Sequence, residues 1–129
     1  MNTEEESKDC CIVNCALHVA KATRYSLEGL AACFRRERAF RIECIVGVVH
    51  LAAVALAPVG AAMAAALVTA WLFLLAAETV NSAIEEVVDA ASPGWSDWAK
   101  RAKDYGSAAV FLATTALLAC WAFAIWDML

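Results

Sequence analysis

Three long apolar segments dominate the pattern of hydrophobic and polar positions along the chain. They run over about residues 40–57, 61–80 and 106–126. Each is close to the roughly 20 residues that an α-helix needs to cross the hydrocarbon core of a bilayer. A bilayer lets such helices keep apolar side chains on the outside of a bundle. The pattern therefore predicts an all-α membrane protein with three transmembrane helices.

The second apolar segment continues without a break into a polar and acidic run, ETVNSAIEEVVD, from Glu78 to Asp89. The helix should continue to about residue 91, because Ser92-Pro93-Gly94 follows and ends it. At about 100° per residue, five polar side chains lie within an arc of about 100° on one helix face. This polar stripe consists of Glu78, Asn81, Ser82, Glu85 and Asp89. The sequence thus predicts three carboxylates and an amide in line on one helix.

The N-terminal part is more polar than the rest. Residues 1–11 are charged and show no period, so we expect a disordered acidic tail. Residues 12–34 predict a helix with one apolar face, which Arg24 interrupts. Two arrangements remain open: an amphipathic helix lying on the membrane surface, or a solvated helix packed on the rest of the protein. Residues 12–129 form a single domain in either case.

The positive charges predict the topology. Lys and Arg are absent between residues 42 and 99, and they cluster at residues 35–41 and 100–103, the second cluster lying in an expected loop over residues 92–104. Two membrane spans separate the clusters, so both lie on one side, which the positive-inside rule makes cytoplasmic. The N-terminus lies there too. That face should gather polar groups from three parts of the chain: Glu37, Glu43, Glu78, Asn81, Glu85, Asp89, Lys103 and Asp104.

Composition narrows the class of protein. Hydrophobic residues make up 63% of the 129 residues, far above soluble domains, so the net charge of −4 says little about partners. The six cysteines fit no standard zinc spacing and are expected to be free thiols. The sequence contains no phosphate-binding loop of the G-x-x-x-x-G-K-[ST] type and no soluble-kinase motif.

The expected depth of the acidic residues in the membrane suggests that some of them have a functional role. A carboxylate in a membrane costs on the order of 3 kcal/mol at the bilayer centre and less toward the interface, so Glu78 should be paired or functional. Glu37 and Glu85 come from different segments, and Mg²⁺ binds to few protein oxygens plus water and phosphate oxygens. Lys103 could hold phosphate oxygens, or serve only as a topogenic lysine.

Three strings in the right order and spacing carry a family resemblance. They are ERAFRIE (37–43), ETVNSAIEEVVD (78–89) and RAKDYGSAAV (101–110). With them, residues 18–126 resemble the small bacterial integral-membrane diacylglycerol kinases. The resemblance implies a homotrimer of three-span subunits in the bacterial inner membrane, each with an N-terminal surface helix and with active sites between subunits. It also implies transfer of phosphate from ATP, with Mg²⁺, to the primary hydroxyl of diacylglycerol, and no nucleic-acid partner.

The resemblance also implies roles for individual residues. Glu78 resembles the general base, and Glu37 and Glu85 resemble the Mg²⁺ ligands. Nucleotide-side positions are matched by Tyr25, Asn81, Glu37, Glu85, Lys103 and Asp104, and His18 stands where the family commonly has an arginine near the nucleotide. Lipid-side positions are matched by Ser107, Phe40 and Arg41.

Two alternatives remain open. An undecaprenol kinase of the same superfamily would use the same chemistry on a polyprenol. A non-catalytic membrane oligomer would use the polar stripe only for helix association.

Overall fold

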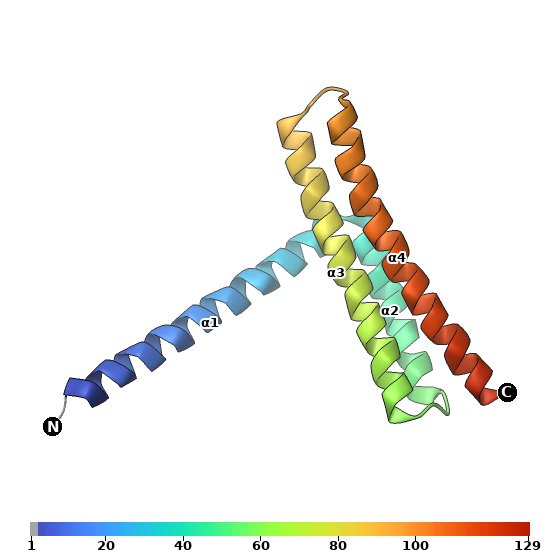
Figure 1. The fold of residues 1–129 in the computed structure, drawn as a ribbon, viewed down its shortest axis with the longest axis horizontal. Helices are drawn as coiled ribbons and strands as arrows, with labels where there is room; N and C mark the ends of the chain where they lie inside the picture. Colours follow the sequence, from blue (N-terminus) through green and yellow to red (C-terminus); the bar gives the residue numbers. More distant parts are fainter. Residues whose placement is uncertain (1–2) are drawn as a thin grey trace.

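The chain forms a three-helix bundle with a fourth helix leading away from it (Figure 1). The computed structural model describes residues 3–129, with side chains from Leu17 onward. Its helices are α1 (Thr3–Arg36), α2 (Arg38–Leu56), α3 (Ala61–Ala91) and α4 (Asp97–Met128). The described residues contain no strand. The predicted all-α fold is confirmed.

Helices α2, α3 and α4 are each long and apolar enough to cross a membrane, as predicted. Most of their side chains point outward; Val49 and Phe73, for example, are 69% and 70% exposed. A soluble bundle would bury such residues, whereas lipid tails accept them. The small interior is centred on Val54, Leu67 and Ala124, one from each helix. The chain is therefore a multi-pass membrane protein.

Helix α3 packs most extensively on α4, and the two form an antiparallel pair (Figure 1). With 31 residues, α3 is about 46 Å long at 1.5 Å per residue. The hydrocarbon core of a bilayer is only about 30 Å thick. The end of α3 that carries the polar stripe therefore extends beyond the apolar layer.

Two aromatic contacts tie the three spans together below the polar stripe. Trp121 Nε1 on α4 donates a hydrogen bond to His50 Nδ1 on α2 at 3.1 Å. The ring of Trp71 on α3 lies on Gly47 of α2, where a β-carbon would collide with the indole. His50 is buried and its ring contacts the rings of Trp71 and Trp121, so it is a packing residue within the bundle.

The connection between α3 and α4 is shorter than the sequence pattern suggests. Helix α4 begins at Asp97, inside the segment expected to be a loop. The side chain of Ser96 accepts a hydrogen bond from the backbone N–H of Ala99, which caps the new helix. The polar residues 97–104 thus form the first turns of α4 rather than a loop.

Helices α1 and α2 are separated by a single non-helical residue, Glu37. Arg41 Nη1 donates hydrogen bonds to the carbonyl oxygens of Phe34 and Arg35, and so satisfies the end of α1. A disordered tail was expected over residues 1–11, whereas α1 begins at Thr3; residues 1 and 2 lie outside the described residues.

Candidate active site

The polar stripe on α3 is graded from buried to exposed. Glu78, Asn81 and Ser82 are buried, Glu85 is half-buried and Asp89 is exposed. Ser82 Oγ donates a hydrogen bond to the carbonyl oxygen of Glu78 at 2.9 Å. Asn81 Nδ2 donates to Glu85 Oε1 at 3.2 Å. The inner end of the stripe is therefore shielded, and the outer end meets water.

Carboxylates from two other segments approach Glu78. Glu37 and Glu85 lie close enough to act on the Glu78 carboxylate electrostatically, and Glu78 acts in the same way on Glu43. Among the described side chains, no Lys or Arg forms an ion pair with any of these four carboxylates. Negative charge without a cationic partner at the membrane interface is a setting that favours a bound cation.

The donor set suits Mg²⁺ better than a metal held by protein alone. Among the described side chains, no three His, Cys, Asp or Glu residues are grouped closely enough to hold a metal ion. Mg²⁺ is commonly bound by one or two carboxylates and completes its octahedron with water and substrate phosphates. Glu37 and Glu85, which both act electrostatically on Glu78, could supply those two carboxylates.

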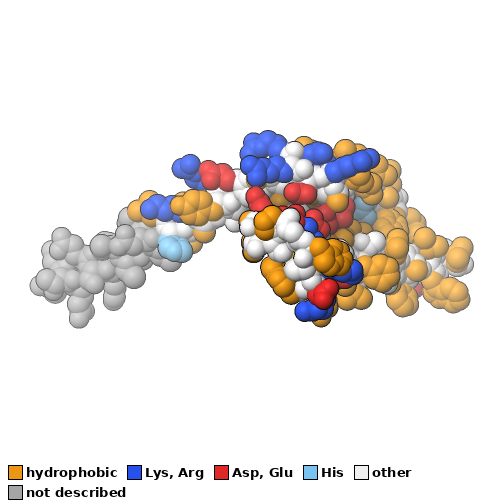
Figure 2. Space-filling view, turned by 90° about the horizontal axis from the view of Figure 1, so that it is seen from above, with side chains coloured by type: hydrophobic (Ala, Val, Ile, Leu, Met, Phe, Trp, Pro, Cys, Tyr) orange, Lys and Arg blue, Asp and Glu red, His pale blue; other side chains and the backbone are white. Residues whose placement is uncertain are grey.

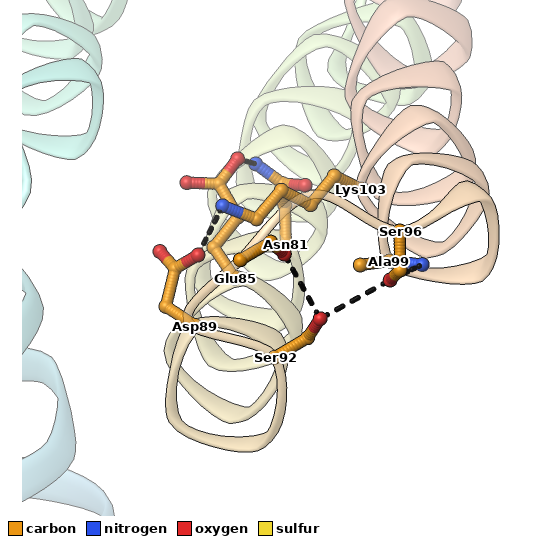
Figure 3. A network of polar contacts seen from close by, with 8 residues as sticks. Asn81, Glu85, Asp89, Ser92, Ser96, Ala99 and Lys103 are labelled. Carbon is orange, nitrogen blue, oxygen red and sulfur yellow. Dashed lines mark hydrogen bonds and ion pairs between the residues drawn. The ribbon is translucent and has the colours of Figure 1, made fainter.

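At the outer end of the stripe, Lys103 reaches from α4 to Asp89 on α3 (Figure 3). Lys103 Nζ on α4 forms an ion pair with Asp89 on α3, and Lys100 pairs with Asp104 one turn along α4. These four residues line a cavity of about 400 Å³ between the end of α3 and the start of α4, with Trp95 at its edge. The cavity thus places two Lys–Asp ion pairs and an aromatic ring at the outer end of the polar stripe.

A second groove, of about 250 Å³, separates α1 from α3. Cys33 and Glu37 line one side, and Thr79 and Ser82 line the other. Arg36 and Glu86 close it with an ion pair of 3.3 Å. This groove places Glu37 opposite the polar stripe, although the two are about 40 residues apart in the sequence.

Figure 2 views the bundle from this end. Acidic side chains gather near the centre, with Lys and Arg around them, and apolar side chains cover the part of the bundle beyond. The expected convergence of polar residues at one end of the bundle is thus present for Glu37, Glu43 and the polar stripe, with Lys103 and Asp104 beside its outer end.

Other predicted site residues lie apart from this group. His18 and Tyr25 are exposed on α1, in the part that leads away from the bundle (Figure 1). Ser107 is exposed on α4. Phe40 is buried at the start of α2, and Arg41 is bound to the end of α1. Their roles stay predictions.

One residue of this region was given no role in the site from the sequence. Gly106 on α4 is buried directly against the Asn81 side chain. The available signal was a glycine inside a helical segment, which often marks a close approach of two elements. Nothing in the sequence indicated that the approaching element carries the polar stripe.

Comparison with known proteins gives the family. Residues 24–125 match the model of the prokaryotic diacylglycerol kinase family. A diacylglycerol kinase of Pseudomonas aeruginosa is 40% identical over 104 residues, which cover 81% of this chain and 85% of the relative. A diacylglycerol kinase of Escherichia coli is 38% identical over 112 residues, covering 84% and 89%. The chain therefore belongs to the prokaryotic diacylglycerol kinase family, as the three sequence strings predicted, and is a lipid kinase.

Proposed function

We propose that this chain transfers the γ-phosphoryl group of ATP to the primary hydroxyl of diacylglycerol and so forms phosphatidic acid. The observation that carries the proposal is the buried Glu78 with Glu37 and Glu85 beside it, none of them in an ion pair with a described Lys or Arg. A carboxylate at this depth can meet a lipid hydroxyl from the membrane while the phosphates of ATP approach from water. The clusters of Lys and Arg at residues 35–41 and 100–103 favour placing this end of the bundle on the cytoplasmic side of an inner membrane.

In this proposal Glu78 is the general base. It accepts the proton of the lipid hydroxyl as the hydroxyl oxygen bonds to the γ-phosphorus, and the bond from that phosphorus to the bridging oxygen of ADP breaks. Ser82 Oγ, one turn further along α3, donates its hydrogen bond to the Glu78 backbone carbonyl and leaves the Glu78 carboxylate free of this donor. Asn81 orients Glu85 through its amide.

Glu37 and Glu85 would hold Mg²⁺. When bound, the ion would neutralise charge on the β- and γ-phosphate oxygens. Lys103 and Asp104, which line the cavity between α3 and α4, would contact the nucleotide at its outer side. Lys103 would have to exchange Asp89 for a phosphate oxygen, a small cost because the pair is partly exposed.

The oligomer is part of the proposal. Helix α1 leads His18 and Tyr25 away from the bundle of their own chain, which supports a nucleotide role only if another subunit lies nearby (Figure 1). A homotrimer with active sites between subunits would meet this condition. The lipid contacts proposed for Ser107, Phe40 and Arg41 belong to the same arrangement.

The test compares Glu78→Gln with Glu86→Gln in purified protein assayed with diacylglycerol and Mg-ATP. Glu86 is the matched control, because it lies on the same helix but off the stripe and pairs with Arg36. We expect Glu78→Gln to lose at least about 100-fold in kcat with the oligomer intact, and Glu86→Gln to stay near the original rate. Dissociation of the oligomer by Glu78→Gln, with activity lost in proportion, would instead support a purely structural stripe.

Two further measurements define the substrate and the metal. Undecaprenol assayed in parallel separates the two kinase hypotheses, and a preference for the polyprenol would overturn diacylglycerol as the acceptor. Activity that survives removal of divalent ions would overturn the roles of Glu37 and Glu85.

A further inference from the structure

We propose that Gly106 is a positioning residue: by lacking a side chain it holds the Asn81 amide in place, and Asn81 in turn orients Glu85. The inference rests on the proposed function, in which Glu85 binds the metal. It adds a residue on a second helix that acts on the metal site without touching metal or nucleotide.

The contact between α3 and α4 at this point leaves no room for a side chain. A β-carbon on Gly106 would overlap Asn81 Oδ1 and would lie 3.2 Å from Asn81 Cγ. Both residues are buried. The absence of a β-carbon is therefore what allows the amide to occupy the space over Gly106.

The same distances indicate which group would move if Gly106 carried a β-carbon. The β-carbon would stand 3.6 Å from Asn81 Cα, an ordinary van der Waals contact. Helices α3 and α4 thus need not separate to admit a methyl group. The end of the Asn81 side chain would have to rotate away instead.

That rotation would break a hydrogen bond within the polar stripe. Asn81 Nδ2 donates to Glu85 Oε1 at 3.2 Å, whereas Asn81 Oδ1 is buried and accepts no hydrogen bond from any described residue. The amide is thus held by Glu85 on one side and by contact with Gly106 on the other. If a methyl group takes the place of the contact with Gly106, the amide turns away and the Glu85 carboxylate loses its hydrogen-bond donor.

Gly47 provides a matched comparison. A β-carbon there would overlap the ring of Trp71, so Gly47 is also a close-packed helical glycine. Its neighbour is an apolar ring and no member of the polar stripe. Gly47→Ala should therefore disturb packing without disturbing Glu85.

The experiment measures Mn²⁺ affinity by electron paramagnetic resonance, with a non-hydrolysable ATP analogue bound to the full-length protein in nanodiscs. Hydrogen-bond partners of metal ligands typically contribute 10–100-fold to metal affinity. We expect Gly106→Ala and Asn81→Ala each to weaken Mn²⁺ binding by about 10-fold or more. Combined, they should weaken it no further than Asn81→Ala alone, because both act through one amide. Gly47→Ala should lower thermal stability and leave Mn²⁺ affinity unchanged.

Two outcomes would overturn the inference: unchanged Mn²⁺ affinity in Gly106→Ala, or a double variant whose losses add. If Gly106→Ala does not fold, the double variant decides, since Asn81→Ala removes the overlap; failure of that variant to recover folding also counts against the proposed contact. A Glu85→Gln variant distinguishes failure of the positioning role of Gly106 from failure of the proposed metal role of Glu85. Mn²⁺ affinity unchanged in Glu85→Gln would overturn the metal role of Glu85 itself. Weakened affinity in Glu85→Gln with normal affinity in Gly106→Ala would overturn only the positioning role.

Discussion

At the residue scale, adjacent glutamates on α3 have unlike surroundings. Glu85 is half-buried and accepts a hydrogen bond from Asn81, whereas Glu86 is exposed and pairs with Arg36. The difference comes from the helical rotation of about 100° between neighbours. One step along the chain thus separates a candidate metal ligand from an ordinary surface ion pair.

Cys33 offers a test of the environment around Glu37. Burial, and next the negative charge of Glu37, raise the pKa of the Cys33 thiol above its ordinary value, against a hydrogen bond with Thr79 that lowers it. Because the thiolate is the reactive form, alkylation of Cys33 should require a higher pH than alkylation of a free cysteine. The rate of reaction with N-ethylmaleimide, followed against pH in a variant that keeps only this cysteine, measures the shift.

Glu37→Gln in that variant should move the alkylation profile to lower pH, because one of the charges opposing the thiolate is gone. Glu28→Gln, on the same helix and paired with Arg24, is the control and should leave the profile unchanged. A profile that Glu37→Gln does not move would contradict the close approach of Glu37 to Cys33.

The stripe itself was predictable because it depends only on helical periodicity. Glu78, Asn81 and Glu85 needed no knowledge of tertiary contacts to be placed on one face. The fit between Gly106 and Asn81 was not predictable in this way. It depends on the register of α4 against α3, and local sequence does not encode that register.

At the scale of elements, the start of α4 depends on a cap. Ser96 Oγ accepts the hydrogen bond from the Ala99 backbone and also lies 3.1 Å from Ser92 Oγ at the end of α3. Loss of such a cap typically costs about 1 kcal/mol. The same residue thus caps one helix and contacts the end of the other.

We expect Ser96→Ala to lower stability by about 1 kcal/mol and to loosen the first turns of α4, including Lys100 and Lys103. Thermal unfolding in detergent and amide hydrogen exchange over residues 97–103 measure the two effects. Ser26→Ala is the matched control, because Ser26 only bonds back to Ala22 within an exposed helix. Equal effects of the two changes would refute the capping role.

The three apolar helices could be predicted from length and hydropathy, but the start of α4 could not. Residues 97–104 are polar, which suggested a loop following Pro93 and Gly94. The cap at Ser96 and the packing of buried Ala99 outweigh that composition. Polarity predicts contact with water, and an exposed helix satisfies it as well as a loop does.

At the scale of the whole molecule, polar contacts across the spans stabilise a bundle with a small interior. The hydrogen bond from Trp121 to His50 joins α4 to α2 within the apolar region. Hydrogen bonds between membrane helices contribute about 0.6 kcal/mol on average and up to about 1.7. We expect Trp121→Phe to reduce stability by an amount in this range while the folded protein keeps its activity.

Unfolding in increasing sodium dodecyl sulfate measures that loss. Trp126→Phe is the control, because Trp126 is 78% exposed and forms no side-chain hydrogen bond with a described residue. A larger loss in Trp126→Phe than in Trp121→Phe would contradict the role of the hydrogen bond. No pattern in the sequence predicts that His50 pairs with Trp121, which lies 71 residues away.

Because the membrane spans differ in length, we expect the rate of the enzyme to depend on the thickness of the surrounding bilayer. Helix α2 has 19 residues, about 28 Å, whereas α3 is about 46 Å long. Hydrophobic mismatch would therefore be accommodated by tilting or by changing the depth of Glu78, at fractions of a kcal/mol per Å. In vesicles of increasing acyl-chain length, the rate should pass through a maximum near the natural thickness, about 30 Å, and fall in thicker bilayers that cover Glu78 with lipid tails. A rate independent of thickness would mean that the depth of Glu78 is fixed by protein contacts alone.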